Sequence, residues 1–142
     1  MVAKYKTLTL TARSEDMYTV TARIQGHEYI VDQSAEMGGK DSGARPVAFL
    51  LMALGGCQLM TARAFLRRNR LVKIKNIEVE MSADITTEED HNMFAIYNIN
   101  LMVDGQLTEE QRTEMKAYVD KYCDVGQILR NNNTINTTIS LK

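Results

Sequence analysis

The sequence predicts an α+β fold in which antiparallel strands surround one long helix. Short runs of alternating apolar and polar residues occur in a group of three before position 33 and in a group of two between 77 and 104. Between these groups, the segment 46–68 begins with nine apolar residues without a break. Alternation with a period of two is typical of half-buried strands, whereas a continuous apolar segment of this length is typical of a buried helix.

Length and composition indicate one ordinary globular domain, residues 1–142. The 142 residues are 44% hydrophobic and 25% charged, and 17 basic side chains against 18 acidic ones leave a net charge of −1. A chain this close to neutrality has no electrostatic footprint for nucleic acid or for an anionic membrane, so neither partner is expected. The first 13 residues, MVAKYKTLTLTAR, lack the apolar core of a signal peptide. We therefore expect a cytoplasmic protein.

Three strands are predicted in the first part of the chain. Residues 4–12 are rich in Thr and alternate, and a second alternating run follows over 17–24. The tripeptide Gln25-Gly26-His27 predicts a hairpin turn into a third strand over 28–32. The loop 33–45 carries three glycines and no periodicity, and it is either a plain connection or a flexible wall near a site.

One helix is predicted from Pro46 to Arg68. Proline is favoured at the first helical position, and the arginines at 67 and 68 suit the negative end of the helix dipole. Twenty-three residues at 1.5 Å each give a helix roughly 34 Å long. Gln58 interrupts the apolar run well short of the ~20 residues that a membrane span requires, which favours the core helix of a soluble domain.

The first half of this helix is apolar on all sides and must be covered on all sides. A chain of this size has little material to do so, and a dimer in which two such helices lie together would supply the cover. Gly55 and Gly56 follow the apolar run. Each costs about 1 kcal/mol relative to Ala inside a helix, which indicates a close approach to the backbone, such as a second copy of the helix.

The second part of the chain predicts a hairpin, a helix, a short helical turn and a last strand. The hairpin pairs 77–85 with 94–104 across the charged turn TTEEDHN, in which His91 reads as a solvated turn residue. Thr108 and Gln111 form a capping box that opens a helix ending at Cys123. A helical turn over 124–130 and a strand over 134–142 complete the order βββ-α-ββ-α-(α)-β.

Two cysteines, Cys57 and Cys123, are the candidate reactive groups. Cys57 in an apolar helix can be simply a small buried hydrophobe. In the cytoplasm, two cysteines so far apart in sequence are expected to be free or redox-active thiols and not a structural disulfide. Zinc requires three or four ligands at tight spacing, and the two cysteines are scattered from His27 and His91, so no metal site is expected.

The stretch DSGARPVAFLLMALGGCQLMTAR resembles the signature of the OsmC and organic hydroperoxide resistance family. In that signature a glycine-rich loop and a proline precede an apolar helix bearing a cysteine. The second family cysteine follows at the end of a later helix, where this chain has Cys123 in YVDKYCDV. The order of strands and helices also matches, so the resemblance covers essentially the whole chain. The segment LLMALGGC is more similar to the broad OsmC-like branch of the family than to the hydroperoxide-resistance branch proper.

The resemblance implies an OsmC-like fold, an intertwined homodimer with its two sites at the subunit interface. It implies a peroxidase in oxidative stress defence, in which Cys57 attacks the O–O bond of an organic hydroperoxide and becomes a sulfenic acid. Cys123 resolves this acid as a disulfide, and a dithiol, lipoyl-type or small, reduces it without a cofactor. Apolar residues near Cys57 would favour bulky hydroperoxides over hydrogen peroxide, and the candidates are Phe49, Leu50, Met52 and Met60.

In the family an arginine from the N-terminal strands activates the first cysteine, because a thiolate and not a thiol is the nucleophile. Arg13 lies nearest that place and Arg23 is the alternative, although either can be an ordinary charge on a strand face. Arg45 and Arg63, which flank the helix, are weaker candidates.

The family's acid that follows the proline and holds the arginine is missing, because Val47 and Ala48 stand there. Glu36 or Asp41 is a possible substitute. The loss favours a second hypothesis, a family member without peroxidase chemistry that binds a small apolar ligand or serves as a stress-associated dimer. A dithiol oxidoreductase or redox sensor that uses the same cysteine pair is a third.

Overall fold

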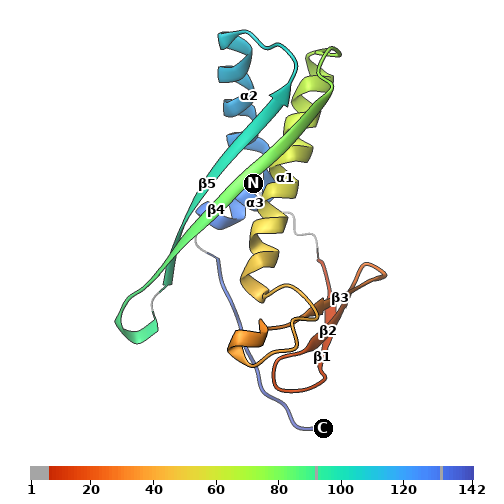
Figure 1. Cartoon of the computed structure of the whole chain (residues 1–142), viewed down its shortest axis with the longest axis vertical. Helices are drawn as coiled ribbons and strands as arrows, with labels where there is room; N and C mark the ends of the chain where they lie inside the picture. Colours follow the sequence, from red (N-terminus) through yellow and green to blue (C-terminus); the bar gives the residue numbers. More distant parts are fainter. Residues whose placement is uncertain (1–6, 92, 132) are drawn as a thin grey trace, which may run out of the picture. The chain divides into compact units, whose positions relative to one another are not determined.

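The structure is a computed structural model that describes residues 7–91, 93–131 and 133–142. It contains two compact units, the first ending at Leu50 and the second beginning at Leu51 (Figure 1). Each unit combines hydrogen-bonded antiparallel strands with helical segments, so the predicted α+β class is confirmed. The expectation of a single domain over 1–142 stays a prediction.

The first unit contains a three-stranded antiparallel sheet in the order β1-β2-β3. Its strands are β1 (Leu10–Ser14), β2 (Val20–Ile24) and β3 (His27–Val31). The turn between β2 and β3 consists of Gln25 and Gly26, with φ values of 51° and 79°. Positive φ at both positions is the type I′ form of a two-residue hairpin loop, whose twist matches the twist of the flanking strands. The predicted hairpin is therefore confirmed, with His27 as the first residue of β3.

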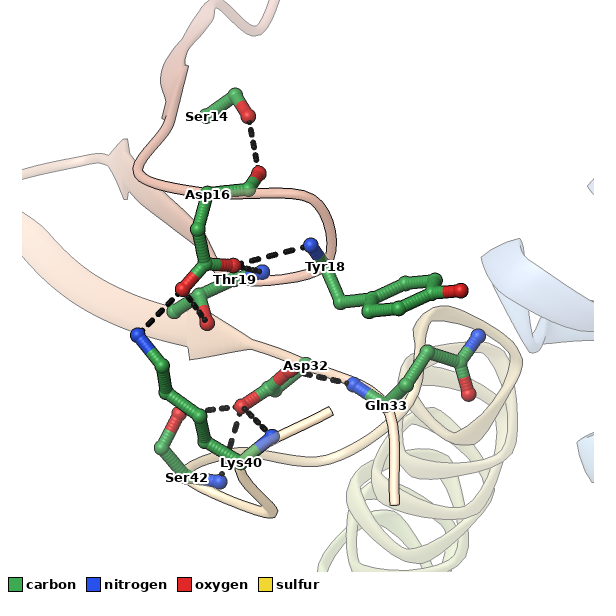
Figure 2. A network of polar contacts seen from close by, with 8 residues as sticks. All are labelled: Ser14, Asp16, Tyr18, Thr19, Asp32, Gln33, Lys40 and Ser42. Carbon is green, nitrogen blue, oxygen red and sulfur yellow. Dashed lines mark hydrogen bonds and ion pairs between the residues drawn. The ribbon is translucent and has the colours of Figure 1, made fainter. Parts of the chain in front are cut away.

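The loop after β3 is ordered by the buried carboxylate of Asp32 (Figure 2). This carboxylate accepts hydrogen bonds from the amides of Gln33, Lys40 and Ser42 at 2.7, 3.3 and 3.1 Å, and from the Ser42 hydroxyl at 2.6 Å. The hydroxyl, above all, lowers the pKa of Asp32, with the backbone amides acting in the same direction against the effect of burial. The short 3-10 helix η1 (Ala35–Met37) lies in this loop.

A second carboxylate, that of Asp16, ties the same loop to the β1–β2 turn (Figure 2). It accepts hydrogen bonds from the amides of Tyr18 and Thr19 at 3.0 and 2.7 Å, and from the ammonium group of Lys40. The Lys40 ammonium is the main reason that the pKa of Asp16 is lowered, and Asp16 in turn raises the pKa of Lys40. The loop 33–45 is thus held at two points, which its irregular sequence did not indicate.

The long helix α1 begins at Pro46 and ends at Arg68, as predicted. Its buried residues lie from Leu54 onwards. By length and composition alone α1 could also cross a membrane. This is weak evidence, because the core helix of a soluble protein passes the same test.

The second unit pairs β4 (Asn76–Thr87) with β5 (Met93–Asp104) in one antiparallel hairpin, with the 3-10 segment η2 (Glu89–His91) at its turn. The helices α2 (Glu109–Tyr122) and α3 (Asp124–Arg130) follow, and Thr108 and Gln111 form the predicted capping box. In Figure 1 the hairpin crosses in front of α1 and α2, and residues of α1, β4 and α2 share one core. The buried core consists of Ala62, Phe65, Leu66, Ile74, Ile77, Met115 and Val119.

The strand predicted over 134–142 is not formed. Residues 133–142 contain no strand, and Ile135, Ile139 and Leu141 are 89%, 93% and 96% exposed. Alternation records which side chains would share a face, but a strand also needs a neighbouring edge to pair its amides and carbonyls. The predicted strand over 4–12 is observed as Leu10–Ser14, and residues 4–6 lie outside the described part of the chain.

Candidate functional site

Cys57 lies on α1, one turn after the point at which the helix becomes buried, and is itself half-buried. Gly55 shows why the helix backbone can approach the sheet here. A Cβ added at Gly55 would lie 2.9 Å from Met81 Sδ and 3.5 Å from Val79 Cγ1, both on β4. The close approach expected at the two glycines is therefore made at Gly55 by the hairpin of the same chain, whereas an added Cβ at Gly56 meets nothing within 4 Å.

Cys123 is fully buried at the junction of α2 and α3. It is the C-cap of α2, where its amide donates to the Val119 carbonyl, and also the N-cap of α3. Its Sγ accepts a hydrogen bond from the Gly126 amide at 3.4 Å. The capping box at Thr108 fixes where α2 begins, and the length of α2 then places Cys123 against α1.

The structure brings the two cysteines close enough for the Cys57 thiol to act on the pKa of Cys123. Both are in the free thiol form. Burial is the main cause that raises the pKa of Cys123, and the hydrogen bond with Cys57 acts in the same direction. The Gly126 amide and the charge of Arg130 act against these effects and favour the thiolate. Two thiols so placed can exchange between the dithiol and the disulfide.

A groove of about 420 Å³ is lined by residues next to the cysteines in sequence, although by neither cysteine itself. Gln58, the neighbour of Cys57 in sequence, lines it together with Arg130 at the end of α3. Its other lining residues come from β5, α2 and the connection between them: Tyr97, Ile99, Leu101, Val103, Leu107, Arg112, Met115, Lys116, Val119 and Asp120. A larger hollow of about 810 Å³ around Gly105 includes neither cysteine and none of the predicted site residues.

Arg13, the predicted activating cation, lies on β1 in the first unit. Its guanidinium forms hydrogen bonds to Glu15, from Nε to Oε1 at 3.2 Å and from Nη2 to both carboxylate oxygens at 3.0 and 3.3 Å. The alternative, Arg23, faces Glu28 across the β2–β3 ladder at 3.7 Å. Cys57 belongs to the second unit. The role of Arg13 at Cys57 therefore stays a prediction.

Glu36 and Asp41 were considered as substitutes for the family's acid, which Val47 and Ala48 replace, and in the described part of the chain neither is paired with an arginine. Among the described residues, neither Glu36 nor Asp41 forms an ion pair, and the carboxylate that holds Arg13 is Glu15. Of the weaker candidates, Arg63 donates to the Asn76 side chain at 3.3 Å.

The apolar side chains expected to surround Cys57 are mostly exposed in the single chain. Leu50, Met52 and Met60 are 44%, 58% and 76% exposed. Phe49 is half-buried and packs edge-on against Tyr29, with 6.4 Å between the ring centres. An apolar lining at Cys57 would therefore require a further surface to cover this part of α1.

Two charged residues near the cysteines were missed by the sequence reasoning, Arg130 and Asp120. The Arg130 guanidinium donates to the Asp120 carbonyl from Nη1 and to the Asp120 carboxylate from Nη2, each at 3.3 Å. Arg130 is seven residues after Cys123, which is two helical turns and therefore the same side of α3. That spacing was the signal in the sequence that could have identified Arg130.

Comparison with known proteins agrees with this architecture. A sequence model of the family described as OsmC-like protein matches residues 39–138. No match is found among the curated proteins.

Solved structures share the fold at low sequence identity. An OsmC-like protein from Mycoplasma pneumoniae is 20% identical, with 88% of each chain covered and a TM-score of 0.73. An organic hydroperoxide resistance protein OsmC from Legionella pneumophila is 11% identical, with 92% of this chain and 93% of that chain covered and a TM-score of 0.72. The organic hydroperoxide resistance protein OhrB of Bacillus subtilis is 15% identical, with 89% and 93% covered and a TM-score of 0.67.

Proposed function

The chain belongs to the family of OsmC-like proteins, and from this premise we propose that it is a thiol-dependent peroxidase that reduces organic hydroperoxides in oxidative stress defence. Cys57 is the attacking thiol and Cys123 the resolving thiol. The single observation that carries the proposal is the proximity of these two free thiols, which is close enough for Cys57 to act on the pKa of Cys123. The organic hydroperoxide resistance proteins that share the fold support the choice of substrate class.

The chemistry needs three steps. The Cys57 thiolate attacks one peroxide oxygen, so that an S–O bond forms, the O–O bond breaks, and the alkoxide leaves as an alcohol after taking a proton. Cys123 then attacks the sulfur of the Cys57 sulfenic acid, forming the S–S bond and releasing water. A dithiol reductant, lipoyl-type or small, returns both cysteines to thiols and becomes a disulfide itself.

Arg13 is the residue proposed to stabilise the Cys57 thiolate, with Glu15 holding its guanidinium in one orientation. An arginine beside a thiol favours the charged form, and a bidentate carboxylate fixes the planar group. Arg13 would act on a Cys57 whose surroundings are completed by a second copy of the chain, because Leu50, Met52 and Met60 are exposed in the single chain. We therefore propose a cytoplasmic homodimer, without nucleic acid or membrane partners.

Steady-state turnover tests this function. Purified protein with a dithiol is expected to reduce cumene hydroperoxide faster than hydrogen peroxide, and Cys57→Ser is expected to abolish the reaction. A rate equal to that of the Cys57→Ser variant, with the thiols of the parent protein shown to be reduced beforehand, would overturn the proposal.

A second function is favoured by one specific feature, the apolar pair Val47 and Ala48. These side chains cannot hold an arginine, and an OsmC-like dimer without peroxidase chemistry could use the groove beside the cysteines for a small apolar ligand. In that case cumene hydroperoxide is not turned over, and an apolar ligand protects the protein against thermal unfolding in Cys57→Ser as well as it does in the parent.

A further inference from the structure

We propose that Arg130 is a positioning residue that faces Cys123 and favours the thiolate with which this residue attacks the sulfur of Cys57. The inference rests on the proposed function, because it assigns Cys123 the resolving step. It assigns a cation to the sulfur of Cys123 in the second unit. This cation is separate from Arg13, which is predicted to act on Cys57.

Gly126 shows that the guanidinium of Arg130 and the sulfur of Cys123 face one small space. A Cβ added at Gly126 would lie 3.0 Å from Arg130 Nη1 and 3.4 Å from Cys123 Sγ. The nitrogen and the sulfur can therefore be no farther apart than the sum of these two distances. Gly126 and Cys123 are buried, while the Arg130 side chain is 50% exposed, so solvent weakens the attraction between the charge and the sulfur without removing it.

Arg130 is fixed in this place by Asp120 on α2. Its Nη1 donates to the Asp120 carbonyl and its Nη2 to the Asp120 carboxylate, while the Lys116 ammonium binds the other carboxylate oxygen at 2.6 Å. Gln127 also donates to the Asp120 carbonyl, at 2.7 Å. The guanidinium is thus held by two contacts to the residue that lies one turn before Cys123.

The charged and titratable groups around Cys123 come from each neighbouring element. They include the Cys57 thiol on α1, the Asp120 carboxylate and the Lys116 ammonium on α2, and Asp124 and Arg130 on α3, while Tyr97 of β5 and Arg112 of α2 line the adjoining groove. Asp120 already has two cationic partners. Among the side chains of these elements, Arg130 is the one whose charge acts on Cys123 in the direction of the thiolate.

The step that Arg130 promotes is the closing of the disulfide. The Cys123 thiol releases its proton, the thiolate attacks the sulfur of the Cys57 sulfenic acid, the S–S bond forms, and the S–O bond breaks. The departing hydroxide takes up a proton and leaves as water. A larger thiolate fraction at Cys123 makes this step faster at neutral pH.

The first experiment titrates Cys123 alone and uses no peroxide. Cys57→Ser leaves Cys123 as the single cysteine of the chain, and the ultraviolet absorbance of the thiolate is followed against pH, with the variant lacking both cysteines subtracted. Adding Arg130→Met is expected to move the titration of Cys123 to higher pH. Arg130→Lys keeps a positive charge and is expected to move the titration less than Arg130→Met does. The matched control is Lys121→Met, which removes a cation that stacks on the ring of Tyr122 and is expected to leave the titration in place.

A second variant keeps the guanidinium but fills the space in front of it. Gly126→Ala places a methyl group against Arg130 Nη1, and alanine is a better helix former than glycine, so the variant is expected to fold at least as well. Gly126→Ala is also expected to move the titration of Cys123 to higher pH. With both cysteines present, Arg130→Met is expected to slow disulfide formation from the sulfenic acid about tenfold near neutral pH, and the deficit is expected to shrink as the pH rises.

An unchanged titration in folded Arg130→Met or Gly126→Ala would overturn the role of Arg130, whatever the protein does with peroxides. If the titration moves but the parent protein shows no peroxide turnover, the proposed function fails and the effect of Arg130 on Cys123 stands.

Discussion

The reactivity of each cysteine is decided at the scale of single residues, by what touches its sulfur. Cys123 is fully buried and would be an inert thiol in apolar surroundings alone. The Gly126 amide at 3.4 Å and the Arg130 charge oppose that effect, while the Cys57 thiol adds to it. The net effect raises the pKa of Cys123, so the neutral thiol prevails, and the Gly126 amide and Arg130 make the thiolate easier to form when Cys123 reacts.

Gly55 is the residue that lets α1 approach β4 beside Cys57. Gly55→Val is expected to destabilise the protein by about 1–3 kcal/mol, because the added carbons would overlap Met81 and Val79 on β4. The measurement is the free energy of unfolding in urea.

The matched control for Gly55→Val is the same substitution at Gly56, where an added Cβ meets nothing within 4 Å. It is expected to be neutral or slightly stabilising within the chain, since glycine is the poorer helix former. Equal losses at the two positions would contradict the specific contact between Gly55 and β4.

At the scale of elements, the loop 33–45 shows how a carboxylate substitutes for regular structure. Asp32 ends β3 and satisfies three backbone amides and one hydroxyl of the loop that leads to α1. Buried backbone groups need such partners, and a loop without strand or helix must find them in side chains.

The Asp32 contacts imply a pH-dependent loop. The pKa of Asp32 is lowered in the folded protein, so its contribution is fully present above the unfolded value of about 3.9 and is lost as the pH falls below it towards the folded value. Protection factors of the Lys40 and Ser42 amides in hydrogen exchange are expected to fall over that window. Asp32→Asn is expected to reduce them about tenfold already at neutral pH, because the charged acceptor is gone.

The control for the Asp32 prediction is Asp41→Asn. Asp41 lies in the same loop, its side chain makes no hydrogen bond or ion pair among the described contacts, and asparagine tolerates its positive φ of 54°. It should leave the two amides protected at every pH. A loss of protection in Asp41→Asn equal to that in Asp32→Asn would show that the loop responds to charge in general and not to the Asp32 contacts.

The elements differ in how well the sequence predicts them. The bounds of α1 were predictable, because Pro46 and the terminal arginines mark its ends within one continuous stretch. The β4–β5 hairpin was predictable from alternation alone. The prediction of a strand over 134–142 was wrong because alternation does not reveal whether a neighbouring strand is available for pairing. The Asp32 network was missed because, in the sequence, an acid at a strand end cannot be told from a solvated surface charge.

At the scale of the whole molecule, the sequence predicted a pair of thiols but not their surroundings. Cys57 and Cys123 were identified by their positions in two helices, and the fold brings them together in the second unit. Arg130 was missed, because its effect depends on how α3 turns back towards α2. The role of Arg13 was predictable only from the resemblance to the family and depends on an arrangement of the two units that stays a prediction.

The exposed apolar residues in the first half of α1 favour association of the chain with a partner. Val47, Leu50 and Met52 leave apolar surface uncovered, and uncovered apolar surface of this kind favours a second copy or another partner. The proposed homodimer would cover this surface and complete the surroundings of Cys57, so the redox chemistry should be measured on the protein as it assembles in solution.

The most direct test of the central claim, that Cys57 and Cys123 act as one redox pair, is a single turnover. Reduced protein receives one equivalent of cumene hydroperoxide, and its free thiols and disulfides are then determined by mass spectrometry. The account predicts the loss of both thiols and a disulfide between Cys57 and Cys123 within one chain. Two free thiols after the reaction time, or an oxidised Cys57 beside a Cys123 that remains free, would contradict it.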